Sequence, residues 1–231
     1  MRTFWKSMNR IYEKVMLVIF VVTLLITVYA LYDTWYVFDH ANDTSYLKYK
    51  PNVVNADSLP EDSPITSDMV GWITIPDTKI DYPIMQGEDN TTYLNIDPYG
   101  QFSLSGSIFL DSRNAPDFSD PYSVIYGHHM EYGVMFGALD EYLDESYLQS
   151  HKKGELLVGR DGKVMYELEI FYAASADAKD DYIFDPAKYE ELYAFLQEKG
   201  LKTDHRILCL STCAGDASTT RTVVFAYILE N

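Results

Sequence analysis

The most continuous run of apolar residues lies near the N-terminus of the chain. Residues 15–32 read VMLVIFVVTLLITVYALY, and no charged residue interrupts them. In a helix that rises about 1.5 Å per residue, roughly 18 residues span about 27 Å, which is enough to cross the hydrocarbon core of a bilayer. The pattern therefore predicts a transmembrane helix over 15–32.

The charges around this run predict its orientation. Residues 1–14 contain Arg2, Lys6, Arg10 and Lys14 but only one acidic residue. Basic residues remain on the cytoplasmic side, so we expect residues 1–14 in the cytoplasm and everything after residue 32 outside the cell. A cleaved signal peptide is the alternative, with small residues near 28–30 as its cleavage site. The run exceeds the usual signal core of about 7–15 residues, which favours an uncleaved signal-anchor.

Beyond the run, polar and apolar positions divide the chain into two parts. Residues 33–66 are polar and proline-containing, which indicates an extracellular stalk with a short helix near residues 45–50. From residue 67 to 231, short apolar runs alternate with clusters of Gly, Pro, Asn and Asp, which is typical of strands and turns. This part is predicted to form a closed β-barrel or a sandwich. The expected strands cover residues 71–75, 79–85, 106–110, 122–126, 155–158, 163–174, 206–211 and 222–229.

Two helices are predicted among these strands. Asp185 can cap a helix, Pro186 suits its first position and Gly200 can end it, so we expect a helix over 186–199. A weaker apolar pattern predicts a second helix over 136–148, with Leu139 and Leu143 facing the core.

Composition and charge restrict the partners. The chain carries a formal net charge of −17, with 47% hydrophobic and 15% aromatic residues. This is ample apolar material for a core, and 231 residues suit one domain with an appendage. The acidic body repels phosphate backbones, so no nucleic-acid partner is expected.

The two cysteines differ in their surroundings. A strand over 206–213 would place Cys209 and Cys213 on one face, about 13 Å apart at roughly 3.3 Å per residue. A disulfide needs Cα atoms within about 7 Å, so we expect no bond between them. Cys209 lies among apolar residues and is expected to be buried. Cys213 ends the strand, where a thiol can reach a cleft and act as a nucleophile.

Two further residues can assist a thiol at that position. A hairpin between the strands would bring Arg221 beside Cys213, where a guanidinium favours the thiolate or binds a developing oxyanion. His128 and His129 end another apolar strand, and a thiol nucleophile needs such a proton partner. Neighbouring strand residues face opposite ways, so only one histidine should face the cleft. An ordinary surface arginine is the alternative for Arg221.

A zinc site built from the two cysteines and the two histidines was also considered. The thiols of Cys209 and Cys213 would lie too far apart on a strand to share one ion. We therefore predict no metal and no cofactor.

Together these residues resemble the sortase signature. Leu210-Ser-Thr-Cys213 is followed by Arg221, and Tyr126-Gly-His128 lies upstream. The resemblance to class B sortases extends over residues 67–231. It includes Val70-Gly-Trp-Ile73, Ile80-Asp-Tyr-Pro-Ile84, Asn90, Tyr93-Leu94, Gly106-Ser-Ile-Phe-Leu-Asp111 and Met135-Phe136.

The resemblance implies an eight-stranded barrel and a cysteine transpeptidase in a Gram-positive-type cell envelope. Cys213 would attack a C-terminal sorting motif of a secreted surface protein and form a thioester. His128, rather than His129, would act as acid and base, and Arg221 would stabilise the oxyanion or hold the substrate. A cell-wall precursor amine would release the product. A pilin lysine as the acceptor, and a non-catalytic wall-binding barrel, are the alternatives.

Some residues fit this pattern less clearly. Asp97-Pro-Tyr99 is similar to the lid motif of pilin-polymerising class C sortases, but it falls inside the barrel region and is expected to form a turn. Ser211 and Asp216 are weaker candidates to assist catalysis.

Overall fold

The computed structural model describes residues 2–41, 44–51, 63–213 and 219–230. The chain divides into two compact units, Met1–Asn42 and Asp43–Asn231. We describe each unit by itself.

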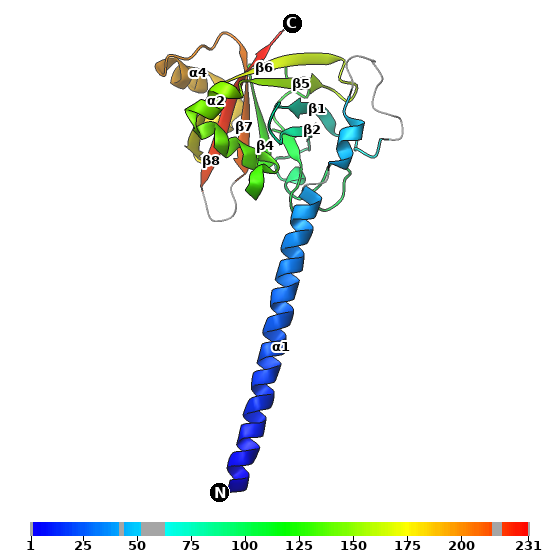
Figure 1. Cartoon of the computed structure of the whole chain (residues 1–231). Coiled ribbons are helices and arrows are strands. Elements are labelled where there is room, and N and C mark those ends of the chain that lie inside the picture. The colour runs from blue at the N-terminus through cyan, green and yellow to red at the C-terminus, as the bar shows by residue number, and fades with distance from the viewer. Residues whose placement is uncertain (1, 42–43, 52–62, 214–218, 231) are drawn as a thin grey trace. The chain divides into compact units, whose positions relative to one another are not determined.

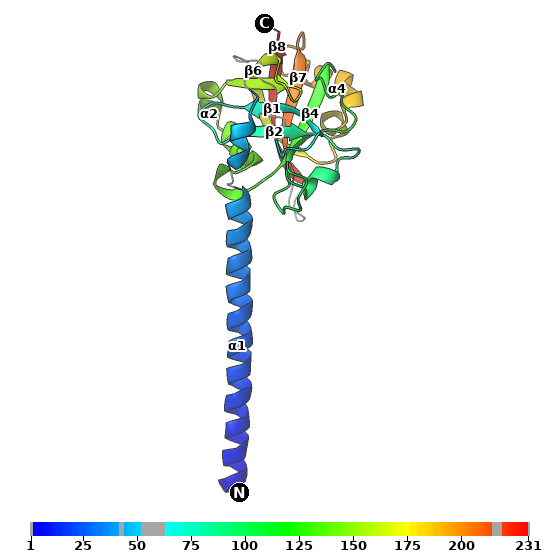
Figure 2. The same ribbon diagram turned by 90° about the vertical axis from the view of Figure 1, so that its right-hand side faces the viewer.

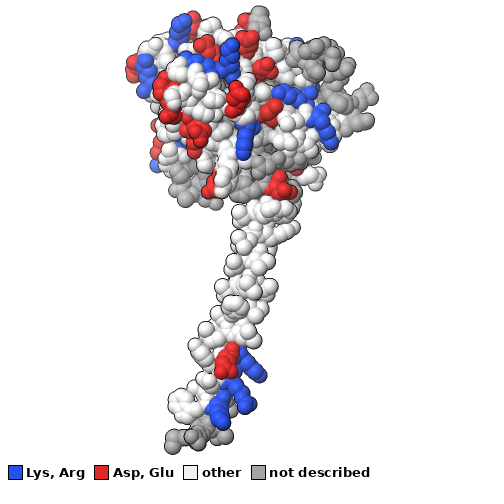
Figure 3. Space-filling model, viewed as in Figure 1, with Lys and Arg blue, Asp and Glu red and all other residues white. Residues whose placement is uncertain are grey.

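The first unit is one helix, α1 (Arg2–Ala41), and it contains the predicted span. Its segment Met8–Tyr36 has a mean hydropathy of 2.7, and it is the one helix in the described part of the chain that is long and apolar enough to cross a membrane. Figure 3 shows Lys and Arg side chains near the start of this helix and none along the apolar stretch that follows. The hydroxyls of Thr23 and Thr27 donate to carbonyls four residues earlier, which satisfies them inside the apolar run.

The second unit is a closed barrel of eight strands, with the order β1-β2-β3-β4-β7-β8-β6-β5 (Figures 1 and 2). Each predicted strand is present, so the expected barrel is confirmed and the sandwich alternative is wrong. The strands are β1 (Met69–Thr74), β2 (Asp81–Met85), β3 (Ile108–Leu110), β4 (Tyr122–His128), β5 (Lys153–Val158), β6 (Val164–Asp177), β7 (Arg206–Cys213) and β8 (Thr220–Leu229).

Three neighbouring strands bring distant parts of the chain together. β4 runs parallel to β7, and β7 pairs antiparallel with β8 as the expected hairpin. On one face of these strands, Tyr122, Cys209 and Phe225 pack with Leu192 and Leu196 of α4 (Tyr189–Glu198) in one buried cluster. The helix therefore fixes the three strands against one another through apolar contacts.

The helix predicted over 186–199 is confirmed, although its first turn is tighter than expected. It begins as a 3-10 helix, η5 (Pro186–Lys188), and continues as α4. The carboxylate of Asp185 accepts a hydrogen bond from the amide of Ala187 at 3.1 Å, and Gly200 takes a positive φ of 76° just beyond the end. Cap, proline and glycine thus act as the sequence indicates.

The helix predicted over 136–148 is two separate helices. A 3-10 helix, η4 (Phe136–Leu143), is followed by α2 (Glu145–Ser150), and Asp144 between them has extended backbone angles and caps α2. Leu139 is buried as expected, but the placement of Leu143 is wrong, because its side chain is 49% exposed. A 3-10 helix repeats every three residues, so Tyr142 shares the buried face with Leu139.

Shorter elements complete the second unit. The helix expected near residues 45–50 is present as a 3-10 helix, η1 (Ser45–Tyr49), and Lys50 Nζ lies 2.8 Å from the Asp81 carboxylate. Asp97 anchors the expected turn by accepting hydrogen bonds from the amides of Tyr99 and Gln101. The remaining helices are η2 (Thr92–Leu94), η3 (Glu131–Gly133) and α3 (Asp181–Phe184).

Candidate active site

A hollow of about 350 Å³ lies beside β4, β7 and β8. Its lining combines apolar, aromatic and cationic side chains, which suits a peptide with an apolar side chain and polar backbone groups. The lining residues are Asn90, Leu94, Phe109, Arg113, Tyr126, Ala178, Phe184, Thr212 and Arg221.

The ends of three strands carry the sequence-predicted residues, and of these Arg221 lines the hollow. In the parallel pair of β4 and β7, the Cα atom of His128 is the register partner of the Cα atom of Cys213. In the β7·β8 hairpin the register ends at the pair Ser211 and Val223, so Cys213 and Arg221 each lie two residues beyond this last pair. The structure describes the backbone of Cys213 but not its side chain.

His128 is partly buried at the end of β4. Burial lowers its pKa from the ordinary value of 6.5, because burial penalises the charged form. Its Nδ1 atom is buried and has no hydrogen-bond partner among the described residues. A neutral histidine with a free ring nitrogen can accept a proton from a thiol or an amine.

Gly127 explains how β4 carries His128 into this position. A Cβ atom at this residue would lie 2.4 Å from Ile108 Cδ1 and 2.8 Å from the ring of Phe136. Only glycine leaves room for β4 to pass between these two side chains, so the residue before His128 fixes the path of the strand.

Arg221 offers hydrogen-bond donors that the described residues do not use. Its side chain lines the hollow, and its Nη1 atom is buried without a hydrogen-bond partner in the described part of the chain. A buried donor on a charged group is costly when it is unpaired. The cost is offset if a ligand oxygen accepts from Arg221 when the site is occupied.

Three residues that line the hollow are held by a carboxylate that the sequence did not single out as a site residue. Asp111 is fully buried and accepts hydrogen bonds from Asn90 at 2.8 Å, Tyr126 at 3.0 Å and Arg113 at 2.9 and 2.7 Å. Burial alone would raise the pKa of Asp111, but the bonds and charge of Arg113 outweigh it and the pKa is lowered. Asn90 and Asp111 appeared in the sequence only as parts of the class B resemblance, so that resemblance was the available signal.

Cys209 is confirmed as a structural residue. It is fully buried, is a free thiol, and burial raises its pKa to about 12, so it does not form a thiolate at neutral pH. Ser211 is also fully buried, and its hydroxyl donates to the carbonyl of Thr212. Asp216 lies outside the described residues.

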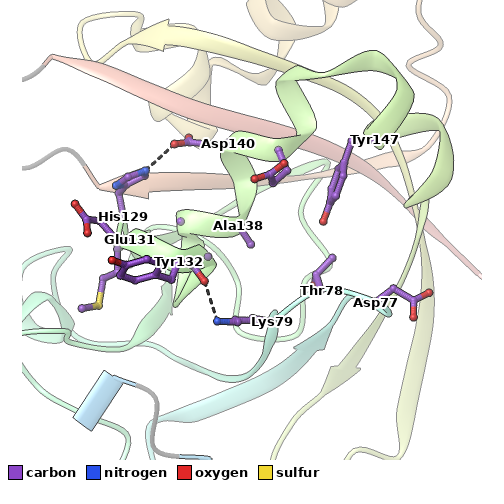
Figure 4. Close-up of a pocket in the computed structure, with 13 residues that line it drawn as sticks. Asp77, Thr78, Lys79, His129, Glu131, Tyr132, Ala138, Asp140 and Tyr147 are labelled. Atoms are coloured by element: carbon purple, nitrogen blue, oxygen red, sulfur yellow. Dashed lines mark hydrogen bonds and ion pairs between the residues drawn. The ribbon is translucent and has the colours of Figure 1, made fainter. Parts of the chain in front are cut away.

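His129 has a different environment from His128. It lines a second hollow of about 630 Å³, which η3, η4 and residues 77–79 also border (Figure 4). Its Nε2 atom lies 2.7 Å from the carboxylate of Asp140, and the two side chains point toward each other. The two histidines therefore do not share one environment.

The sequence of this chain matches a known protein family. A sequence model of the sortase domain matches residues 73–229, which is more than half of the chain. This chain belongs to the sortase family. Sortases of this kind are cysteine transpeptidases, and they act on proteins that carry a sorting motif.

The relatives point to the sortase B type. Sortase B of Staphylococcus aureus (strain NCTC 8325 / PS 47) is 35% identical over 180 residues, which cover 72% of each chain. Sortase B of Listeria monocytogenes serovar 1/2a (strain ATCC BAA-679 / EGD-e) is 36% identical over 170 residues, covering 68% of this chain and 67% of the relative. The crystal structure of a Streptococcus pyogenes class B sortase involved in pilus biogenesis superposes with a TM-score of 0.64 at 38% identity, covering 71% of this chain and 94% of that one.

Proposed function

We propose that this sortase cleaves the C-terminal sorting motif of secreted surface proteins and transfers them to a cell-wall peptide amine. Cys213 is the proposed nucleophile, His128 the acid and base, and Arg221 the oxyanion donor. The register of β4 with β7 carries this proposal, because it pairs His128 with Cys213. Arg221 supports it from β8, two residues beyond the last pair of the hairpin.

The proposed reaction has two steps at one carbonyl carbon. His128 takes the proton of the Cys213 thiol, and the resulting thiolate attacks this carbon. Arg221 donates to the oxygen as it gains charge, and the carbon–nitrogen bond breaks. The leaving amine takes a proton from His128, and a thioester remains. The acceptor amine then attacks the thioester, His128 takes its proton, and the Cys213 thiolate leaves.

Competition between two acceptors tests which amine is used. The full-length enzyme in detergent would receive a sorting peptide together with a cell-wall stem-peptide amine or a pilin domain with an accessible lysine. We expect the stem-peptide adduct to exceed the pilin adduct, as measured by mass spectrometry. A larger yield of pilin adduct would overturn the assignment to cell-wall anchoring while leaving the chemistry of the site intact.

Pilin polymerisation is the second candidate function, and one observation favours it. The Streptococcus pyogenes relative that resembles this chain is described as involved in pilus biogenesis. Both functions use the same thioester and differ only in the amine that resolves it.

We also propose that α1 anchors the enzyme as a single span, with the N-terminus in the cytoplasm and the barrel outside. The cations near the start of α1 and the charge-free stretch after them support this orientation. Residues 1–14, 15–32, 33–66 and 67–231 would then be cytoplasmic terminus, span, stalk and catalytic domain.

The topology can be checked by adding protease to intact protoplasts. We expect the barrel to be digested and a short membrane-protected fragment from the N-terminus to survive, because protease does not cross the membrane. A tag placed at the N-terminus would identify that fragment, and a cytoplasmic protein would serve as the control for lysis. Protection of the barrel would contradict the proposed orientation.

A further inference from the structure

We propose that Asp140 is a positioning residue that fixes the three catalytic candidates relative to one another. It does so through one neighbour of each: His129 follows His128, Thr222 follows Arg221, and Thr212 precedes Cys213. The inference rests on the proposed function of the site, because it assumes that those three residues perform the reaction.

The first contact joins η4 to the end of β4. The Nε2 atom of His129 lies 2.7 Å from Oδ2 of Asp140, and Figure 4 shows the two side chains next to each other at one edge of the second hollow. Both side chains are more than 40% exposed, so the contact itself adds little to stability. Its effect is on position, because it holds His129, the residue after His128, next to η4.

The second contact joins the same carboxylate to β8. The hydroxyl of Thr222 donates to Oδ1 of Asp140 at 2.6 Å, and Thr222 is largely buried. The two oxygens of Asp140 thus hold two strands at once. Since neighbouring strand residues face opposite ways, Thr222 reaches Asp140 on the side of β8 opposite to that from which Arg221 lines the first hollow.

A third contact extends the connection to β7. The backbone amide of Thr222 donates to the hydroxyl of Thr212 at 2.9 Å, and Thr212 is buried directly before Cys213. This side-chain bond occurs beyond Ser211 and Val223, the last residue pair in the register of the hairpin. The ends of β7 and β8 are therefore linked by side-chain bonds of Asp140, Thr222 and Thr212, at a point beyond the last backbone pair of the hairpin.

The backbone of η4 is placed to supply Asp140 at this point. A Cβ atom at Gly137 would lie 1.8 Å from the carbonyl oxygen of Met130, the residue after His129. A side chain at position 137 would therefore prevent this close approach of η4 to Met130. Asp140 lies one 3-10 turn after Gly137, on the same side of that helix. The carboxylate that contacts His129 and Thr222 therefore comes from η4, and not from the strand that carries either residue.

This arrangement suits a reaction that depends on the relative placement of three groups. Small displacements of catalytic groups can cost up to about 10²-fold in rate even when each group is present. A loss of Asp140 would leave Cys213, His128 and Arg221 chemically intact but less well aligned. The loss should appear in the turnover number and not in substrate affinity.

The test compares Asp140→Ala with Asp144→Ala in the full-length enzyme in detergent. Asp144 is a matched control, because it is also an exposed carboxylate on the same segment and its bonds only cap α2. We expect Asp140→Ala to lower kcat for a sorting peptide about tenfold, with KM within twofold. Asp144→Ala should lower the melting temperature at least as much and leave kcat within twofold.

Two partner variants make the test independent of one substitution. Thr222→Val and His129→Ala each remove one contact, so each should lower kcat by less than Asp140→Ala. Either variant added to Asp140→Ala should cause little further loss, because the shared link is already broken. Unchanged kcat in Asp140→Ala, equal losses in Asp144→Ala, or losses that multiply in the double variants would each overturn the proposal. If the unsubstituted enzyme formed no thioester, the proposed function itself would fail instead.

Discussion

Replacing Cys213 with alanine should abolish cleavage of a sorting peptide, because no other described thiol can become the nucleophile. The enzyme would lose the atom that forms the thioester, and the oxyanion donors alone cannot replace it. Turnover of a fluorogenic peptide measures the loss. Intact-mass measurement of the unsubstituted enzyme should show an acyl adduct, which the Cys213→Ala protein should lack.

Cys209→Ala is the matched control for this experiment. Cys209 lies on the same strand, fully buried in the cluster beneath α4, and its pKa of about 12 keeps it protonated. Its removal should cost some stability through a small cavity but leave most of the activity. Residual turnover in Cys213→Ala would sink the assignment. A Cys213 that does not react with thiol reagents would favour the non-catalytic wall-binding barrel.

Replacing Arg221 with lysine should cost about 3–4 kcal/mol of transition-state stabilisation, or roughly 10²–10³ in rate, as expected for one lost oxyanion donor. A guanidinium offers planar, directed donors, whereas an ammonium keeps only the charge. The Nη1 atom of Arg221 has no hydrogen-bond partner among the residues that the structure describes, which is consistent with a donor that acts in the transition state. The loss should fall mainly on kcat.

The pattern across two variants separates the possible roles of Arg221. If the arginine acts mainly through its charge on the thiolate, Arg221→Lys should recover much of the activity that Arg221→Ala loses. Near-normal kinetics for both variants would mean an ordinary surface residue. Arg206→Lys is a useful control, because Arg206 lies at the other end of β7 from Cys213. Its guanidinium donates to Phe118 and Glu230 and lies over the ring of Tyr166.

Much of the barrel could be predicted from local sequence. Turn residues between apolar runs located all eight strands, and Asp185, Pro186 and Gly200 marked both ends of one helix. The hairpin that brings Arg221 toward Cys213 followed from the short distance between two apolar strands. These features depend on neighbours within a few residues, so the sequence carries them directly.

Other features depend on packing between distant segments. Nothing near Leu143 signals that η4 is a 3-10 helix, so the inward side was misassigned there. The pairing of His128 with Cys213 joins strands that are 85 residues apart, and only the resemblance to sortases indicated it. Asp140 lacked any sequence signal, because its partner Thr222 is 82 residues away.

The place of β8 between β6 and β7 has a consequence for the order of folding. The barrel cannot close until Thr220–Leu229 pairs with both neighbours. The strand that carries His128 also pairs only after β7 has been made, because β4 and β7 are distant in sequence. Contacts between distant segments require closure of the intervening chain, which has an entropic cost. A chain still being synthesised therefore has no assembled site before its residues up to β8 have emerged. Such an incomplete chain should be inactive until β8 is present.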